Sequence, residues 1–163
     1  MEKTFWDAAY GGKVEEVKSI LRNNPSLNVN WKNESYHART ALYAACYNGH
    51  DSVVSILLAH PGIDPNLKNN VGYTPFMIAC ENGRTFCVRL LLQDQRVMVN
   101  EPRDDGVTPL WWAAYRGHQD VIKWWIGSGR EMNLGKPGDL KTDAIGGAKQ
   151  RKETEEPVGE IQE

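Results

Sequence analysis

Short apolar runs and polar turns alternate along the chain, and this alternation repeats every 34 residues between Thr40 and Thr142. Three segments aligned on the period read TALYAACYNGHDSVVSILL, TPFMIACENGRTFCVRLLL and TPLWWAAYRGHQDVIKWWI, and an earlier copy, KTFWDAAYGGKVEEVKSIL, begins at Lys3. A threonine opens each of the three segments, and each carries a glycine at the same place: Gly49, Gly83 and Gly117. Self-similarity at this period predicts one structural unit that is repeated along the chain.

Each copy has the pattern of two short helices joined by a turn. In the fourth copy, Leu110, Ala113 and Ala114 share one side of a helix. Thr108 and the proline after it predict the helix start, because the hydroxyl can cap the helix and proline fits its first turn. A glycine then ends that helix, and the second helix has apolar residues spaced for burial, namely Val121, Ile122, Trp125 and Ile126. One helix pair cannot bury its apolar side alone, so the copies are expected to stack into a solenoid.

The segment TPLWWA at residues 108–113 is similar to the T-P-L-H-x-A signature of ankyrin repeats, and TPFMIA and TALYAA repeat it. The chain resembles the ankyrin repeat family from about Lys3 to Thr142, which is most of its length. The resemblance implies an all-α solenoid of helix-turn-helix repeats with β-hairpin finger loops between them. At the family's histidine position this chain has Trp6, Tyr43, Met77 and Trp111. These positions are expected to pack differently and to lack the histidine's hydrogen bonds to the turn.

The repeat register also divides the chain into parts. We expect one ankyrin repeat domain over residues 1–148, with repeats at about 3–39, 40–73, 74–107 and 108–141 and a degenerate fifth from 142. Residues 149–163 are charged and are expected to form a partial or frayed C-terminal cap. The middle finger loops carry Gly72 and Gly106 for turns with positive φ, whereas the first loop, WKNESYHAR, has no glycine. The conformation of that first loop is therefore the hardest to predict.

Composition narrows the class of partner. The chain has 163 residues, of which 40% are hydrophobic and 25% charged, and its formal net charge is −2. This balance excludes a basic surface field as the main driver of binding, so neither nucleic acid nor an acidic membrane is expected as a partner. No apolar run approaches the ~18 residues of a membrane span. The first residues lack a signal-peptide pattern, and the three cysteines are too few for a disulfide framework. We expect an intracellular, cytoplasmic protein, with the nucleus left open.

Residues that could carry chemistry occupy structural places in the repeat. Cys46 and Cys80 stand where the repeat normally has alanine, roughly 10 Å apart and too far for a disulfide. Cys87 replaces a core aliphatic residue. His50 and His118 share one repeat position, which favours a structural role at the start of the second helix over metal ligation. No phosphate-binding glycine loop or serine elbow occurs. The sequence predicts neither an enzyme nor a cofactor or metal site.

A protein partner is expected in the concave groove that first helices and finger tips form in such a solenoid. Counted from the first residue of each copy, positions 5 and 8 are an i, i+3 pair that should face this groove. The family has leucine at position 5, so side chains there can be half buried. Tyrosine, tryptophan and arginine suit such a surface because they bury much area at little entropic cost. The predicted partner-binding residues are Tyr10, Tyr36, Arg39, Tyr47, Tyr73, Ile78, Glu81, Arg103, Asp105, Trp112 and Tyr115.

The repeat register assigns a place to each of the six tryptophans, and Trp31 starts the long first finger. Trp6 and Trp111 are predicted to pack between repeats, and Trp125 to lie in the core. Trp124 is expected to be partly exposed on the outer side of a second helix. Trp112 is the tryptophan that should point into the groove, and it is the strongest single candidate for partner contact.

Three classes of function fit these observations. The first is a monomeric, non-catalytic protein–protein interaction module. The second is a structural or assembly segment of a longer ankyrin solenoid. The third is a substrate of an asparaginyl hydroxylase, because ankyrin proteins can be modified at asparagines that follow a leucine by eight residues, as Asn66 follows Leu58 and Asn100 follows Leu92. The competing interpretation is that both asparagines brace their loops by side-chain hydrogen bonds.

Overall fold

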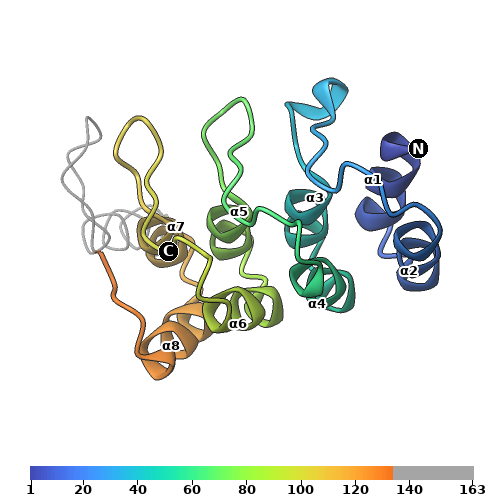
Figure 1. The fold of residues 1–163 in the computed structure, drawn as a ribbon. Coiled ribbons are helices and arrows are strands. Elements are labelled where there is room, and N and C mark those ends of the chain that lie inside the picture. Colours follow the sequence, from blue (N-terminus) through green and yellow to red (C-terminus); the bar gives the residue numbers. More distant parts are fainter. Residues whose placement is uncertain (134–163) are drawn as a thin grey trace, which may run out of the picture.

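The computed structural model describes residues 1–133, so the expected fifth repeat from 142 and the expected cap at 149–163 lie outside the described residues. Within that range the helices pair as the repeat predicts: α1 (Glu2–Tyr10) with α2 (Val14–Asn23), α3 (Ala41–Asn48) with α4 (Asp51–Ala59), α5 (Pro75–Glu81) with α6 (Thr85–Gln93), and α7 (Pro109–Tyr115) with α8 (Gln119–Ser128). Figure 1 shows the odd-numbered first helices in one row, the even-numbered second helices in a row beneath it, and the finger loops projecting from the other side of the first row. The all-α repeat fold is confirmed.

Threonine caps begin the first helices of the three inner copies, as predicted. Each hydroxyl oxygen accepts a hydrogen bond from the backbone N–H three residues later, at 3.1–3.2 Å. Proline occupies the first turn behind two of these threonines, at Pro75 and Pro109. Such a side-chain cap contributes about 1 kcal/mol to helix stability, so the recurring threonine fixes where each repeat starts.

The turn after each first helix carries a bond to the preceding repeat. His50 Nε2 donates to the carbonyl oxygen of Tyr10 at 2.9 Å, and His118 Nε2 donates to that of Glu81 at 2.8 Å. Arg84 takes the same place in the third repeat and donates from Nε to the Tyr47 carbonyl at 3.1 Å. Because a carbonyl only accepts, the bonded ring nitrogen must carry the proton. The structural role predicted for both histidines is confirmed.

Gly83 shows why this turn needs glycine. Its φ is +62°, and a Cβ at this position would lie 2.6 Å from Nδ1 of His118, which packs over the turn. Both the left-handed backbone and the close approach of the imidazole exclude a side chain here. The repeated glycine is therefore part of the contact between neighbouring repeats.

Asparagines that follow the second helices brace the solenoid on its other side. Asn66 donates from Nδ2 to the carbonyl oxygen of Arg96 at 2.8 Å, and its Oδ1 accepts from the N–H of Met98 at 2.8 Å. Asn30 and Asn100 make the same pair of bonds to the following loop, at 2.8–3.0 Å. The bracing interpretation is confirmed, and both ends of each amide are occupied in the folded chain.

The core runs between the two rows of helices. Trp125 is fully buried and meets Phe76 edge to face, with ring centroids 5.0 Å apart. Trp6 and Trp111 are 2% and 7% exposed, so the predicted packing role of all three tryptophans is confirmed. Trp124 is 46% exposed, as predicted for the outer side of a second helix.

The three cysteines are buried free thiols. Burial raises the pKa of Cys87 to about 12 and the pKa values of Cys46 and Cys80 well above the usual range. A thiol held protonated in this way is a poor nucleophile and a poor metal ligand. The cysteines therefore act as small core residues, as predicted.

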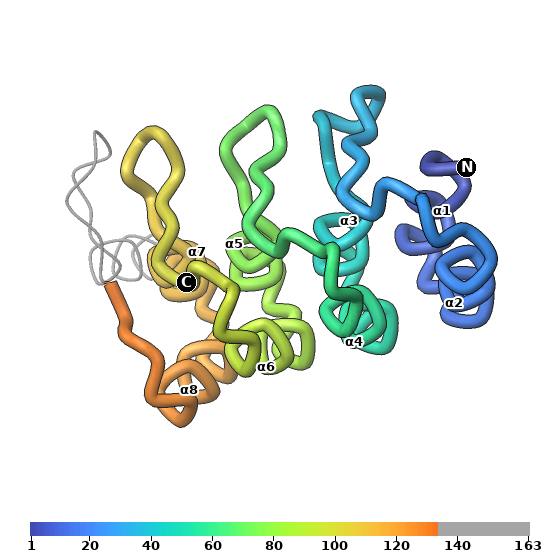
Figure 2. Tube along the Cα trace, in the orientation of Figure 1, coloured from blue at the N-terminus to red at the C-terminus, as the bar shows by residue number. Residues whose placement is uncertain are grey.

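The finger loops are simpler than the β-hairpins that the family resemblance implies. One backbone bond of 3.0 Å closes each of the first three loops, between Asn33 and Arg39, Asn69 and Tyr73, and Arg103 and Val107. Within residues 1–133 these bonds build no strand, and the single isolated β-bridge joins Asn33 to Arg39. Figure 2 shows the loops as narrow projections from the first-helix row.

The first finger, which has no glycine, forms a short 3₁₀ helix before its turn. This helix, η1 (Glu34–Tyr36), is followed by His37 and Ala38 with φ of 58° and 55°. Non-glycine residues adopt that left-handed conformation only at an energetic cost. Ala38 is 3% exposed, so packing of the alanine against the body of the protein offsets that cost.

Candidate partner-binding face

Nearly all the predicted contact residues come together on one side of the molecule, which we call the first-helix face. It comprises the position-8 side chains of the first helices, the finger-loop side chains beside them, and Trp112 of α7. Figure 1 shows the first helices and the finger loops together on one side of the second-helix row. Tyr10 and Tyr36 are 39% and 47% exposed. The remaining members are half-buried, namely Arg39, Tyr47, Tyr73, Glu81, Arg103, Asp105, Trp112 and Tyr115.

Three rings form an N-terminal aromatic cluster on this face. Trp6 stacks on Tyr10 with centroids 5.2 Å apart and an interplanar angle of 16°, and Tyr36 of the finger lies 4.9 Å from Trp6. The indole N–H of Trp6 donates to the carbonyl oxygen of Arg39 at 2.9 Å. Trp6, which stands at the family's histidine position, therefore makes a hydrogen bond of its own to the finger loop.

Arg39 connects the first finger to the second repeat. Its guanidinium carbon lies 5.3 Å from the ring centroid of Tyr43 and 5.0 Å from that of Tyr47. Burial raises the pKa of the Tyr43 phenol, which keeps that ring neutral beneath the cation. The Nε of Arg39 is buried and has no hydrogen-bond partner in the described part of the chain. The cation is held by ring faces, which leaves part of its donor capacity unused.

A C-terminal aromatic cluster occupies the other end of the face. Trp111 stacks on Tyr115 at 4.7 Å and 10°, which repeats the arrangement of Trp6 on Tyr10. Trp112 stands edge-on to Trp111 at 4.9 Å and lies 6.0 Å from Tyr73 of the preceding finger. The indole Nε1 of Trp112 is buried and has no hydrogen-bond partner among residues 1–133.

Two arginines contact the rings of the C-terminal aromatic cluster, and the first of them is Arg103. Arg103 donates from Nη1 to the Tyr73 hydroxyl at 3.0 Å and pairs with Asp105 at 3.0 Å. Burial and, next to it, the charge of Glu81 raise the pKa of Tyr73, and the hydrogen bond from Arg103 partly opposes this rise. The phenol is therefore neutral and can still donate its proton.

Arg116 is a member of this face that sequence reasoning missed. Its Nη2 pairs with Glu81 of the neighbouring repeat at 2.8 Å, and its guanidinium lies 5.5 Å from the Trp112 ring centroid. The equivalent position holds Asn48 and Asn82 in the preceding repeats. The change from asparagine to arginine, directly after the tyrosine at position 8, could have identified Arg116 as a contact residue from the sequence.

Position 5 departs from the prediction. Ile78 is 5% exposed and Ala44 is 1% exposed, so in the inner repeats this position belongs to the core. The prediction that Ile78 contacts a partner does not fit its burial, because the neighbouring first helices close over it. Trp112 occupies the same position in the last described repeat and is half-buried, and among residues 1–133 no further first helix packs beyond α7.

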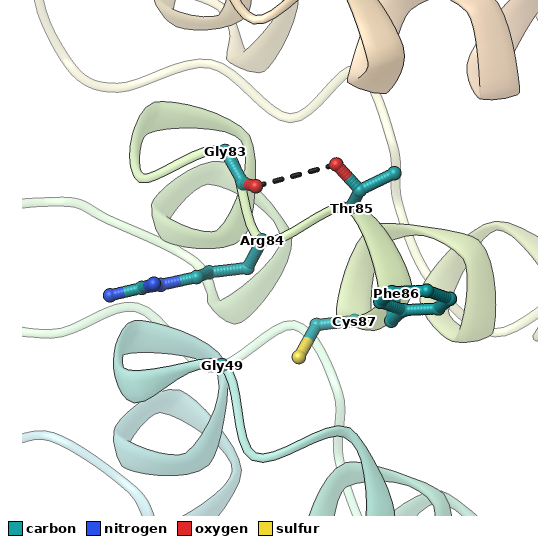
Figure 3. Close-up of a pocket in the computed structure, with 6 residues that line it drawn as sticks. All are labelled: Gly49, Gly83, Arg84, Thr85, Phe86 and Cys87. Atoms are coloured by element: carbon teal, nitrogen blue, oxygen red, sulfur yellow. Dashed lines mark hydrogen bonds between the residues drawn. The ribbon is translucent and has the colours of Figure 1, made fainter.

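Several clefts in the described part of the molecule lie on other surfaces. One of about 290 Å³ sits at the turns between helices and is lined by Gly49, Gly83, Arg84, Thr85, Phe86 and Cys87 (Figure 3). In it the Thr85 hydroxyl donates to the Gly83 carbonyl at 3.4 Å. The one potential nucleophile there, Cys87, is held protonated by burial. Over residues 1–133 no group of histidine, cysteine and carboxylate side chains could hold a metal ion.

The helices of the described range are also too short and polar to span a bilayer.

The sequence model of ankyrin repeats (3 copies) matches residues 4–69 and 61–135. Together with the four described helix pairs, this match shows that the chain belongs to the ankyrin repeat family. Ankyrin repeats are in general protein–protein interaction modules without catalytic activity, and they bind protein partners.

Parts of two known proteins are similar to part of this chain. It is 39% identical over 62 residues to the SMC5-SMC6 complex localization factor protein 1 of Bos taurus, which is 37% of this chain and 6% of that protein. It is 39% identical over 67 residues to the 26S proteasome non-ATPase regulatory subunit 10 of Homo sapiens, which is 41% of this chain and 28% of that protein. The chain thus matches less than a third of the length of each relative.

Proposed function

We propose that this chain is a non-catalytic, monomeric module that binds one partner protein through its first-helix face. The observation that carries the proposal is the row of half-exposed rings and arginines, from Tyr10 and Tyr36 at one end to Trp112 and Arg116 at the other. Aromatic and arginine side chains dominate binding energy in protein interfaces because they bury large areas with few rotatable bonds.

The exposed groups of this face indicate what the partner presents. Tyr10 and Tyr36 are 39% and 47% exposed and offer ring area together with hydroxyl groups that donate or accept. The Arg116 side chain is 48% exposed and carries several N–H donors in a planar group. We therefore expect apolar groups of the partner on the exposed rings and a carbonyl or carboxylate beside the arginine.

Other classes of partner fit the chain less well. A net charge of −2 gives no long-range attraction for nucleic acid or an anionic membrane, so we propose neither as a ligand. We also propose no cofactor and a cytoplasmic location, with the nucleus as the other compartment. The two relatives are, by their names, a localization factor of a protein complex and a proteasome subunit, and association with a larger assembly is our proposal for this chain as well.

Affinity capture with three forms of the chain tests the proposal. The wild type is compared with the Trp112→Ala/Tyr115→Ala variant and with a Lys18→Ala/Ser19→Ala control, which alters exposed residues of α2. A thermal melt of each form shows that it is folded. We expect at least one protein to be captured by the wild type and control and lost from the aromatic variant. Capture of the same proteins by all three folded forms would contradict the proposal.

Two other hypotheses are tested by separate measurements. If the chain is an assembly segment of a longer solenoid, sedimentation should show self-association through its end repeats. If Asn66 or Asn100 is hydroxylated, the intact mass of the protein from its native cell should increase by one oxygen atom. Since both asparagine amides are bonded to the next loop, a hydroxylase would have to open that loop first.

A further inference from the structure

The second-helix side of the molecule carries an aromatic surface that the first-helix face does not include. In α6, Cys87, Val88, Leu91 and Leu92 are buried against the core, and the opposite side of the helix meets solvent. Phe86 is 64% exposed there, and Trp124 of α8 is 46% exposed. Two large rings left in water on neighbouring helices are unusual enough to need a reason.

Arg89 lies between these two rings. Its guanidinium carbon is 3.9 Å from the ring centroid of Trp124 and 5.7 Å from that of Phe86. Within residues 1–133 Arg89 makes no hydrogen bond or ion pair, whereas the cations that stabilise the repeats do, namely Arg84, Arg96, Arg103, Arg116 and Arg130. The rings therefore hold a planar guanidinium in place while its N–H donors stay available to an acceptor from outside.

A row of three separate clefts borders α6. The cleft of about 290 Å³ in Figure 3 has Phe86 at its edge, and a second of about 150 Å³, toward α4, is lined by Phe86, Arg89 and Gln93. A third of about 260 Å³, toward α8, is lined by Arg89, Gln93 and Trp124. Because Arg89 lines both the second and the third cleft, its side chain stands between them.

The charged side chains around these clefts indicate what kind of ligand fits them. Arg89 is a cation without a carboxylate partner, and Lys123 lies on α8 beside Trp124 with 72% of its side chain exposed. Asp51 lines the middle cleft, and Asp120 pairs with Lys123 at 3.6 Å, so acidic groups occupy the two flanks and leave Arg89 as the open charge. A carboxylate forms two parallel hydrogen bonds with a guanidinium, which an isolated neutral acceptor cannot do.

We infer that Phe86, Arg89, Gln93 and Trp124 form a second docking site, which binds a short acidic segment of a partner protein. An aspartate or glutamate of that segment pairs with Arg89, and an apolar side chain beside it enters the cleft next to Trp124. The site is on the second helices and uses no residue of the first-helix face. One chain could therefore hold two proteins, or two parts of one protein, at the same time.

A peptide selection supplies the probe. Random peptides displayed on phage are selected on the wild-type chain, and those that also bind an Arg89→Glu/Trp124→Ala variant are discarded. The enriched consensus peptide is synthesised, and its affinity is measured by fluorescence polarisation for the wild type and for Arg89→Gln, Trp124→Ala and Arg22→Gln. Arg22 is an exposed arginine of α2 and serves as the matched control. Labelling with 5-fluorotryptophan gives each tryptophan a ¹⁹F resonance, assigned by single Trp→Phe variants.

The inference requires an acidic residue beside an apolar one in the consensus. It also requires a loss of at least about tenfold in affinity for Arg89→Gln and Trp124→Ala with none for Arg22→Gln. The Trp124 resonance should shift on peptide binding and the Trp112 resonance should not. Selection of no peptide, of peptides without a carboxylate, or of peptides insensitive to Arg89→Gln would overturn the inference. A dimer in sedimentation that Trp124→Ala abolishes would also overturn it, because a second copy of this chain would then be the occupant.

Discussion

The N-terminal and C-terminal aromatic clusters of the first-helix face share one design and differ in how their polar atoms are satisfied. In both, the position-4 tryptophan stacks on the position-8 tyrosine, at 5.2 Å for Trp6 on Tyr10 and 4.7 Å for Trp111 on Tyr115. At the N-terminal end the indole N–H is bonded to a loop carbonyl. The C-terminal end adds Trp112, whose buried N–H has no acceptor among the described residues. The buried ring of Trp6 therefore serves stability, whereas in our proposal the half-buried Trp112 serves recognition together with the more exposed Tyr10 and Tyr36.

The largest expected effect separates the two clusters by stability. Trp6→Ala removes a ring that is 2% exposed and leaves the Arg39 carbonyl without its donor. We expect the free energy of unfolding to fall by about 3–5 kcal/mol, as for other buried tryptophans. Urea denaturation followed by circular dichroism measures this loss. Trp6→Phe, which keeps most of the ring area, should recover more than half of it. A loss for Trp6→Ala below about 1 kcal/mol would show that the N-terminal cluster is not structural.

Trp112→Ala tests the other half of the comparison. The side chain is half-buried, so we expect the free energy of unfolding to fall by about 1 kcal/mol. Affinity for the captured partner should fall at least about tenfold, since central aromatic residues carry much of the binding energy. Isothermal titration calorimetry on the folded variant measures the affinity. Unchanged affinity with a large loss of stability would make the two clusters equivalent.

A smaller effect concerns the tyrosine hydroxyls. The Tyr73 hydroxyl accepts a hydrogen bond from Arg103 at 3.0 Å, whereas the Tyr10 hydroxyl makes no hydrogen bond to the described residues. We expect Tyr73→Phe to lower the free energy of unfolding by about 1 kcal/mol and Tyr10→Phe to leave it unchanged. Equal results from the two melts would mean that the arginine of the C-terminal cluster does not stabilise its finger.

The smallest expected effect comes from the ion pair between repeats. Arg116 pairs with Glu81 at 2.8 Å, and the arginine side chain is 48% exposed. We expect Arg116→Gln to cost no more than about 0.5 kcal/mol in dilute buffer, because water screens such a pair. At about 1 M salt the difference should vanish, since the screening length falls to roughly 3 Å. A cost that persists in high salt would point to the contact of Arg116 with the Trp112 ring instead.

The sequence was sufficient for the parts of the fold that depend on local geometry. Thr74 followed by proline requires a helix start, and a glycine that precedes Arg84 requires a turn, whatever the rest of the chain does. The core roles of Trp6 and Trp125 followed from their place in the repeat. The first finger was not predictable, because its left-handed His37 and Ala38 are held by tertiary packing in place of a residue preference.

The residues of the candidate site could likewise be predicted from the sequence where they depend on local geometry, and not where they depend on packing between repeats. Tyr10, Tyr47 and Tyr115 could be placed from the repeat register, since each directly follows a pair of small residues. The burial of Ile78 could not be predicted, because it depends on how closely the neighbouring first helices approach. The stack of Arg89 on Trp124 joins two repeats, and Arg116 reaches Glu81 of the repeat before it. Contacts of that kind depend on how far each repeat is rotated relative to the next. The sequence of one repeat alone does not determine that rotation.

The asparagine that closes each loop has a consequence for how such a chain can grow. Asn66 stands at the start of a 34-residue unit, and the two backbone groups that it binds, at Arg96 and Met98, stand near the end of the same unit. A tandem duplication of residues 66–99 would therefore copy the asparagine together with both backbone groups that it binds. The equivalent hydrogen bonds of Asn30 and Asn100 would be unchanged. Lengthening the solenoid by one repeat requires no compensating substitution at this joint, so an array of this kind can gain binding surface in whole steps.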